Sequence, residues 1–379
     1  MSTRNRLAVL LIASLAAALA QQPSLDPRTS LKIEFPADSP VTLVSADLGD
    51  SATSAQGSAM IIDLHSSLSL RNSATRRIRG VTLLVTAQEV TPGGKASVSV
   101  PSLNVGSGET FPVRVNLRLL RPLVPVRPLV VVSLDGVLFD DLSFYGPNRL
   151  NSRRSMSVWE LEAQRDRRHF KSVLETQGED GLRNAMLESI AKQADRPRLD
   201  VQMARGGPAT TVEAEHPKNF AFLRVPGSPV EPISGVAQVS ANQARAPSIE
   251  VLNRGDRAVR YFELGWIVSD SAGREYLAGS VPASDPNLRL APGQKSQVVQ
   301  EGSLRFLSAP GRPLAISGMT GFVSQVEFVD GSIWIPDRAA LSNPQLSRFV
   351  VPSPEEQRLT EMYRRRGLAA VAAELRKFE

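Results

Sequence analysis

The feature that most constrains the fold of this chain is an internal repeat. When the 379 residues are shifted by 181 positions, Asn72 falls on Asn253, and the residues around it fall on residues of the same kind. The matched pairs are Leu68 and Ile249, Leu70 and Val251, Arg76 and Arg257, Arg79 and Arg260, Leu83 and Leu264, and Val85 and Trp266. A shift of 185 then matches Leu129 with Leu314 and Gly136 with Gly321, as one loop insertion would produce. The sequence therefore predicts that one domain occurs twice.

Both copies show the alternation of β-strands. Apolar residues that share one strand face recur in three segments: Val113, Val115, Leu117 and Leu119; Ile62, Leu64, Leu68 and Leu70; and Phe262, Leu264, Trp266 and Val268. Turn sequences such as Gly106-Ser107-Gly108 and Pro292-Gly293 separate the strands. Short strands in units of about ninety residues predict antiparallel sandwiches. We expect Asn72 and Asn253, just after a strand, to close a turn through the side-chain amide.

The order of strand, Asn, short basic loop, strand and late Gly-rich hairpin resembles the tandem immunoglobulin-like β-sandwich modules of exported bacterial proteins. The segments that carry the resemblance are residues 68–85 and 249–268, with the later pair 136–146 and 321–334. The resemblance implies modules that bind or space rather than catalyse. The disulfide of that family is absent, so Trp266 would pack against aliphatic side chains. We therefore expect a mainly β chain of two antiparallel immunoglobulin-like sandwiches, with a helical insert between them and a C-terminal helix.

The predicted domain order has seven parts. They are a signal peptide over 1–20, an N-terminal extension over 21–59, sandwich 1 over 60–150, a helical insert over 151–197, a linker with peripheral strands over 198–246, sandwich 2 over 247–337, and a tail with an amphipathic helix over 338–379.

The first twenty residues read as an export signal. Arg4 and Arg6 precede an apolar run from Leu7 to Ala20, which ends in the small-x-small sequence Ala18-Leu19-Ala20. The run is shorter than the roughly twenty apolar residues that span a bilayer, which favours cleavage over anchoring. Removing the two arginines lowers the formal charge from +6 to +4. We expect an exported protein, periplasmic or extracellular, with no transmembrane segment after cleavage.

Cysteine is absent from the chain. This excludes disulfides, thiol catalysis and cysteine-ligated zinc. Because the expected destination is oxidising, the two predicted sandwiches must be held together by the burial of apolar strand faces alone.

Two segments carry helical patterns. Ser157 and Glu160 fit a capping box before a helix, Gly178 to Gly181 interrupts the pattern, and a second amphipathic helix follows before Pro197. At the other end, Ser353 and Pro354 mark the start of a helix that Gly367 kinks. Two roles stay open for the C-terminal helix, which either packs back on a sandwich or docks a partner.

The search for catalytic chemistry is mostly negative. The three histidines, His65, His169 and His216, are far apart in sequence and are expected on the surface. Ser189 and Lys192 match the S-x-x-K spacing of penicillin-recognising enzymes, but the K-T-G sequence that those enzymes also need is missing. Asp135, Asp140 and Asp141 form an acidic cluster that could hold calcium, although such residues also commonly decorate a strand end. We therefore predict no catalytic residue, no cofactor-binding residue and no metal ligand.

Arginine clusters supply the candidate partner contacts: Arg76, Arg77, Arg79, Arg364, Arg365 and Arg366. Aromatic residues are scarce, so stacking on nucleic acid is not indicated. Acidic neighbours predict solvated, paired helix faces: Glu160, Glu162 and Asp166 in one helix, and Glu355, Glu356 and Glu361 in the other. The functional alternative is contact with an anionic envelope polymer or a lipid surface, because guanidinium groups fit phosphates and carboxylates.

The sequence is compatible with three functions. The leading hypothesis is a non-enzymatic exported protein that binds or scaffolds in the cell envelope, with an envelope protein or anionic polymer as partner. The second is an envelope hydrolase or carbohydrate-processing enzyme whose catalytic carboxylates are scattered in sequence. The third is a binder of anionic polymers or membrane surfaces through the arginine clusters. The partner and the oligomeric state are not determined by the sequence.

Overall fold

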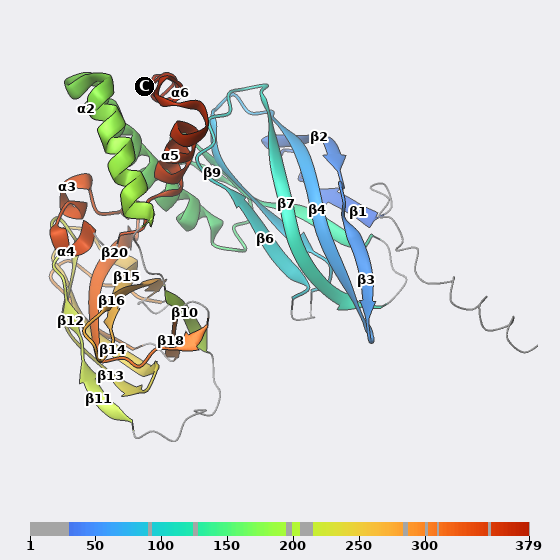
Figure 1. Ribbon diagram of the computed structural model, residues 1–379. Coiled ribbons are helices and arrows are strands. Elements are labelled where there is room, and N and C mark those ends of the chain that lie inside the picture. Colours follow the sequence, from blue (N-terminus) through green and yellow to red (C-terminus); the bar gives the residue numbers. More distant parts are fainter. Residues whose placement is uncertain are drawn as a thin grey trace, which may run out of the picture. The chain divides into compact units, whose positions relative to one another are not determined.

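The computed structural model describes residues 30–89, 93–123, 128–194, 199–204, 215–282, 287–299, 302–308, 311–347 and 350–378. The chain divides into two compact units, Met1–Met156 and Ser157–Glu379. Both are rich in β-structure, as predicted, and Figure 1 shows their strands and helices along the chain. The signal peptide expected over residues 1–20 lies outside the described residues.

Unit 1 is built from two sheets. The first has the order β1-β8-β5-β6 with β9 on β8, and consists of β1 (Leu31–Glu34), β5 (Ile78–Thr86), β6 (Lys95–Val100), β8 (Val130–Phe139) and β9 (Phe144–Tyr145). The second has the order β2-β4-β3 with β7 on β4, and consists of β2 (Val41–Asp47), β3 (Ala52–Gln56), β4 (Ala59–Asn72) and β7 (Thr110–Pro122). The strands β4 and β7 pair from Ala59 to Arg71 and form the long central ribbon that Figure 1 shows.

Residues 31–56, expected in an N-terminal extension, belong to these sheets. β1 pairs in parallel with β8, while β2 and β3 both pair with β4. The long strand β4 offers more backbone than β2 alone can pair, and β3 completes it through a hairpin. Unit 1 therefore departs from the expected antiparallel arrangement where β1 pairs with β8, because these two strands are parallel.

One hydrophobic cluster lies between the two sheets of unit 1. The alternation predicted for β7 holds, since Val113, Val115 and Leu119 are buried and the arginines between them are exposed. The apolar side chains of β4 reach the same cluster, as expected. Burying these faces from water is the main force that holds the two sheets together.

Unit 2 contains two further sheets and the helices. One sheet has the order β12-β20-β15-β16 with β21 on β20, and consists of β12 (Ala221–Phe222), β15 (Val259–Ser269), β16 (Glu275–Pro282), β20 (Gly318–Phe328) and β21 (Ile333–Trp334). The other has the order β10-β18-β14-β13-β11, with β17 on β14 and β19 on β18. Its strands are β10 (Leu199–Ala204), β11 (His216–Asn219), β13 (Val230–Ser240), β14 (Gln243–Asn253), β17 (Lys295–Val299), β18 (Ser303–Ser308) and β19 (Arg312–Pro313). As in unit 1, one pair is parallel, β12 with β20.

The segment 198–246, expected as a linker with peripheral strands, supplies an internal strand. β13 lies between β14 and β11 in the sheet. Its pairing with β14 shifts register between Pro232 and Ser234 and again between Val236 and Gln238. Each shift moves the following side chains to the other face, so the strand lacks the regular alternation that a sequence pattern can reveal.

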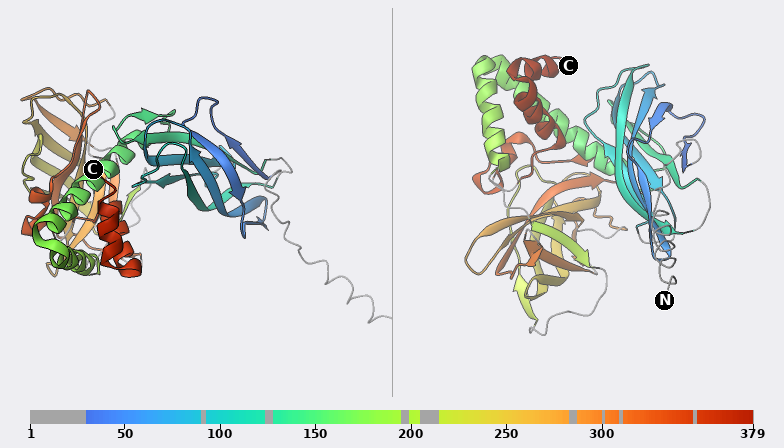
Figure 2. Two further views of the ribbon diagram at one scale, coloured as in Figure 1. Left: turned by 90° about the horizontal axis from the view of Figure 1, so that it is seen from above. Right: turned by 45° about the vertical axis from the view of Figure 1, so that its right-hand side comes forward.

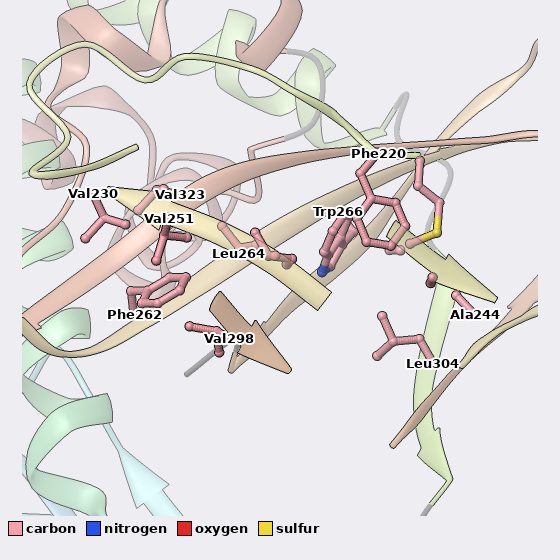
Figure 3. Packing of buried hydrophobic residues seen from close by; sticks show 14 of the residues in the cluster. Phe220, Val230, Ala244, Val251, Phe262, Leu264, Trp266, Val298, Leu304 and Val323 are labelled. Atoms are coloured by element: carbon pink, nitrogen blue, oxygen red, sulfur yellow. The ribbon is translucent and has the colours of Figure 1, made fainter. Parts of the chain in front are cut away.

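Trp266 lies in the hydrophobic cluster of unit 2, at 2% exposure. Its neighbours include the expected aliphatic side chains, but also two aromatic rings. The ring of Phe220 meets it edge-on at 5.0 Å between centroids, and Phe222 lies at 6.5 Å. Figure 3 shows Phe220 beside Trp266, with the aliphatic Leu264 on the same strand. Trp266 is thus packed by aromatic as well as aliphatic side chains.

The helices among the described residues are α2 (Ser152–Ala194), α3 (Arg338–Leu341), α4 (Pro344–Ser347), α5 (Pro354–Arg366) and α6 (Leu368–Leu375). Ser157, expected as an N-cap, lies inside α2. The helix begins at Ser152, where Asn148 Oδ1 accepts a hydrogen bond from the N–H of Arg153 and Asp135 Oδ2 accepts one from Ser152 Oγ. In the described part of the chain, no helix is long and apolar enough to cross a membrane.

Two predicted helix breaks are confirmed. Gly178 interrupts α2 with φ 69° and ψ −163°. Gly367, with φ 77°, separates α5 from α6. Glycine adopts such positive φ without the steric cost that a Cβ would add. The predicted cap of α5 is also confirmed, because Ser353 accepts a hydrogen bond from the N–H of Glu356 and Pro354 occupies the first turn.

Candidate binding site in the helical module

The helical module of unit 2 consists of α2 from Ser157 onward, α5 and α6. The three helices share one hydrophobic cluster, whose buried members are Phe170, Leu182, Met186, Leu359, Val371, Ala372 and Leu375. Both views of Figure 2 show α5 and α6 beside α2. The C-terminal helix therefore packs on α2, rather than on a sandwich as the first of the two expectations had it.

A buried ion pair network joins α2 to α5 on one side of this cluster. Arg167 Nη2 lies 2.6 Å from Glu160 Oε1, and Arg167 Nη1 lies 3.5 Å from Glu355 Oε1. Arg358 donates to both carboxylate oxygens of Glu355 at 2.8 Å. The side chains of Glu160, Arg167 and Glu355 are at most 6% exposed.

A second network joins α2, α3 and α5. Arg165 donates from Nε and Nη2 to the two oxygens of Asp166, which is fully buried. Arg338 Nη1 donates to Asp166 Oδ1 and to Glu356 Oε2, both at 3.2 Å. Ser189 Oγ donates to the other oxygen of Glu356 at 2.6 Å. Four of the acidic residues expected on solvated faces are thus buried: Glu160, Asp166, Glu355 and Glu356. Contacts between helices contribute to their pairing, as Arg167 with Glu355 and Arg338 with Asp166 and Glu356 show.

A cavity of about 510 Å³ lies against the second network. Its apolar wall includes Ala185, Leu341, Val350, Val351 and Pro352. Its polar side chains include Arg165, His169, Glu188, Ser189, Lys192, Arg338 and Glu356. All of these residues belong to unit 2, and they come from α2, α3, α5 and the segment before α5.

Burial and neighbouring charges shift the pKa values of two groups that line the cavity, His169 and Glu188. Burial lowers the pKa of His169 below its usual value, and the Arg338 guanidinium lowers it further, which favours the neutral imidazole. The hydrogen bond from Lys192 holds the pKa of Glu188 below its usual range, with Nζ 2.6 Å from Oε1. Outside the cavity, burial raises the pKa of Glu162 to about 7, against the opposing charge of Arg165.

The three histidines have different environments. His65 and His216 are exposed, as expected. His169, also expected on the surface, is partly buried and lines the cavity. The S-x-x-K pair of Ser189 and Lys192 lies there too, but each side chain already has a carboxylate partner, Glu356 for the serine and Glu188 for the lysine.

The arginine clusters proposed as partner contacts have intramolecular partners. In α5, Arg364 and Arg365 both pair with Glu361, at 3.7 and 2.5 Å, and Arg366 is exposed. In unit 1, Arg77 and Arg79 donate to Asn104 Oδ1.

Arg76 makes a set of contacts that recurs in unit 2. Its guanidinium lies 4.0 Å from the centre of the Phe139 ring and pairs with Asp141 at 3.2 Å. Arg257 likewise lies 3.7 Å from the centre of the Phe328 ring and pairs with Asp330 at 3.4 Å. The repetition indicates a structural role for Arg76.

In the acidic cluster of unit 1, the carboxylates of Asp135 and Asp141 accept hydrogen bonds from nearby groups of the same unit. Asp135 accepts from Ser152 Oγ and from the N–H of Arg149, and Asp141 accepts from the N–H of Ser143. Within the described ranges there is no group of three or more metal-ligating side chains that could hold an ion.

Sequence reasoning missed the cavity. The sequence singled out three of its lining residues, His169, Ser189 and Lys192, but gave no indication that they lie together with Arg338 and Glu356.

No protein-family model matches the chain, and no curated protein matches its sequence. Among solved structures, beta-glucosidase from Kluyveromyces marxianus in complex with glucose is 8% identical with a TM-score of 0.15, over 70% of this chain and 44% of that one. Red sea bream transglutaminase is 9% identical with a TM-score of 0.12, over 78% and 31%. A structure described as pT26-6p is 8% identical with a TM-score of 0.15, over 88% and 72%. The chain thus spans less than half the length of the first two, and likenesses this weak assign neither fold family nor function.

Proposed function

We propose that this chain is a non-enzymatic exported protein of the cell envelope that binds or scaffolds a partner, and that the cavity of the helical module is its binding site. The two β-rich units are proposed to be immunoglobulin-like sandwiches that descend from one duplicated module. The recurring contacts of Arg76 and Arg257 support the duplication.

The observation that carries the binding site is the composition of the cavity. A volume of about 510 Å³ is typical of ligand pockets, which combine apolar walls with a few polar groups that orient the ligand. Here Leu341, Val350 and Val351 provide the apolar wall, and Arg338, His169 and Lys192 provide polar groups. Rigid support comes from Asp166 and Glu356, which hold Arg338 between α2 and α5.

The carboxylates of the cavity favour binding over hydrolysis. A glycosidase needs one carboxylic acid that donates a proton and a second carboxylate that acts as base or nucleophile. Glu356 instead accepts hydrogen bonds from Ser189 and Arg338, and Lys192 holds the pKa of Glu188 low. The Glu356 oxygens are therefore already occupied by donors of this chain, which suits a structural role.

Crosslinking in intact cells, followed by mass spectrometry, tests the proposal. Val351→Glu places a charge on the apolar wall at a side chain that is already 43% exposed, so the fold should tolerate it. Val299→Glu is the matched control, because Val299 is 53% exposed on β17 and does not line the cavity. We expect an envelope partner that the unaltered chain and the control capture and that Val351→Glu loses. An identical set of crosslinked proteins in all three would contradict the proposal.

A further inference from the structure

Arg338 presents unused hydrogen-bond donors at the cavity. Both of its ion pairs, with Asp166 and Glu356, are made by Nη1. Its Nε and Nη2 groups donate no hydrogen bond to any residue that the structure describes, and the side chain is 34% exposed. The guanidinium is therefore held in place at one nitrogen, while the remaining donors are available to a ligand. A fixed guanidinium with free N–H groups is suited to a carboxylate or a phosphate.

Two more polar groups line the same cavity. The ring of His169 tilts against Phe170 at 5.2 Å, and neither of its nitrogens hydrogen-bonds to another described residue. Lys192 uses one contact for Glu188 and remains 45% exposed, which leaves further ammonium N–H groups for a ligand. The carboxylate oxygens of Glu356, in contrast, already accept from Ser189 and Arg338. The unused groups are thus mainly donors, which complement an anion.

Part of the cavity wall is apolar. Leu341, Val350, Val351 and Pro352 line it. A small inorganic anion would leave this wall in contact with water, whereas a ligand with an apolar body would bury it. The cavity therefore combines a place for an acidic head with a place for a hydrocarbon body.

We infer that the cavity binds an acidic amphiphile, a carboxylate or phosphate head carried on an apolar body. The head lies at Arg338, His169 and Lys192, and the body lies along Leu341, Val350 and Val351. This inference rests on the proposed binding function, because it names the ligand class of the same site.

Isothermal titration calorimetry of the full mature chain tests the ligand class. The probes are octanoate, octyl phosphate, octyl glucoside and octylamine, each below the concentration at which it forms micelles, and inorganic phosphate alone. We expect the two acidic amphiphiles to bind at least tenfold more tightly than the neutral and cationic ones, and inorganic phosphate to bind weakly. The stronger of octanoate and octyl phosphate identifies the head group. Equal binding of octyl glucoside or octylamine, or binding of none of the amphiphiles, would overturn the inference.

Variants locate the head group. Lys192→Gln removes one cation from the cavity and is expected to weaken binding of the acidic probe about fivefold to tenfold, as losing one charge-assisted contact does. Arg183→Gln is the control, because Arg183 forms an exposed ion pair with Asp180 on the same helix and does not line the cavity. Equal weakening by both variants would contradict the assigned site. Arg338→Lys, which keeps the charge but removes the fork of donors, should weaken binding more than Lys192→Gln.

His169 provides an independent readout by nuclear magnetic resonance. An acidic head group beside the imidazole stabilises the protonated form of His169. Its negative charge adds to those of Asp166, Glu188 and Glu356, and it opposes the positive charge of Arg338, which lowers the pKa of His169. The pKa of His169 should therefore rise in the complex, while the exposed His65 and His216 serve as internal references. An unchanged His169 titration in a saturated complex would overturn the placement of the head.

The two proposals fail in different ways. If acidic probes do not bind but Val351→Glu still abolishes partner crosslinking, the ligand class is wrong and the binding function stands. If acidic probes bind in the cavity but crosslinking is unaffected by Val351→Glu, the ligand class stands and the partner-binding function is wrong.

Discussion

Asn72 and Asn253 make the same hydrogen bonds in different units of the protein. In unit 1, Asn72 Nδ2 donates to the carbonyls of Arg76 and Val105, and in unit 2, Asn253 Nδ2 donates to those of Arg257 and Leu290. In each unit, Oδ1 accepts from the N–H two residues further along the chain at 2.9 Å. Both side chains are fully buried. The predicted turn-closing role is confirmed for both residues.

Replacing Asn253 should therefore destabilise unit 2. Asn253→Ala removes the side-chain donor to the Arg257 carbonyl and one of two donors to the Leu290 carbonyl, which also accepts from the N–H of Val259. We expect a loss of about 2–3 kcal/mol in the free energy of unfolding. Urea unfolding followed by circular dichroism measures it. Asn219→Ala, at an exposed position of β11, is the control and should change stability by less than about 0.5 kcal/mol. A similar loss in both variants would argue against the turn-closing role.

Residues 246–337, which contain the whole of the predicted sandwich 2, should not fold in isolation. This fragment lacks β13, which pairs with β14, and β12, which pairs with β20. It also lacks Phe220, which packs on Trp266. We expect a far-ultraviolet spectrum typical of disordered chain for 246–337, and a β spectrum for residues 215–337. A folded β spectrum from the shorter fragment would show that β12 and β13 are dispensable.

The buried network of Arg167 should matter far more than an exposed ion pair. Arg167→Met leaves Glu160 and Glu355 buried without this cation, and we expect a loss of about 3 kcal/mol in the free energy of unfolding. Arg183→Gln breaks an exposed pair on the same helix and should cost about 0.5 kcal/mol or less. Chemical denaturation of both variants gives the comparison. Near-equal losses would mean that the buried network contributes little.

Glu162 should make stability depend on pH. Its pKa is raised by burial to about 7 in the folded chain, above the ordinary value of 4.5. Between these values, the folded state binds a proton that the unfolded state releases, so the free energy of unfolding falls as pH rises from about 4.5 to about 7. Glu162→Gln removes this loss and should stabilise the protein at pH 8 by about 1–3 kcal/mol, with little effect at pH 4. Glu175→Gln, at an exposed position of α2, should show no such difference between the two pH values.

Export should remove the first twenty residues. Expression in a secreting bacterial host, followed by intact mass measurement, is expected to give a mature chain that begins at Gln21. Arg4 and Arg6 are needed for the charged start of the signal, so replacing both with Glu should leave uncleaved chain in the cytoplasm. A full-length, uncleaved product from the unaltered gene would contradict the signal-peptide assignment.

The local elements were the most predictable part of this protein. The alternation of Val113, Val115 and Leu119 predicted a strand with one buried face, and Ser353 and Gly367 predicted the two ends of α5. These signals depend on the spacing between neighbours in sequence, which sets the face that a side chain occupies. The short strands β1 to β3 and the bulged β13 were missed because pairing with β8, β4 and β14 decides their conformation.

By itself, the sequence determined that this is a mainly β chain with a repeated Asn and Arg turn, kinked helices and no cysteine. Only the tertiary structure determined which charged side chains are buried and which residues they pair with. Ser189 and Glu356 are 167 residues apart in the sequence, yet Ser189 Oγ lies 2.6 Å from Glu356 Oε1. Arg338 of α3 pairs with both Asp166 of α2 and Glu356 of α5. The sequence pattern of charges along a helix is the same in two cases. Each charge can pair with a solvent-exposed partner on the next turn, or with a buried partner on another helix. Only the packing of α5 against α2 removes the water, and with it creates both the ion pair networks and the cavity.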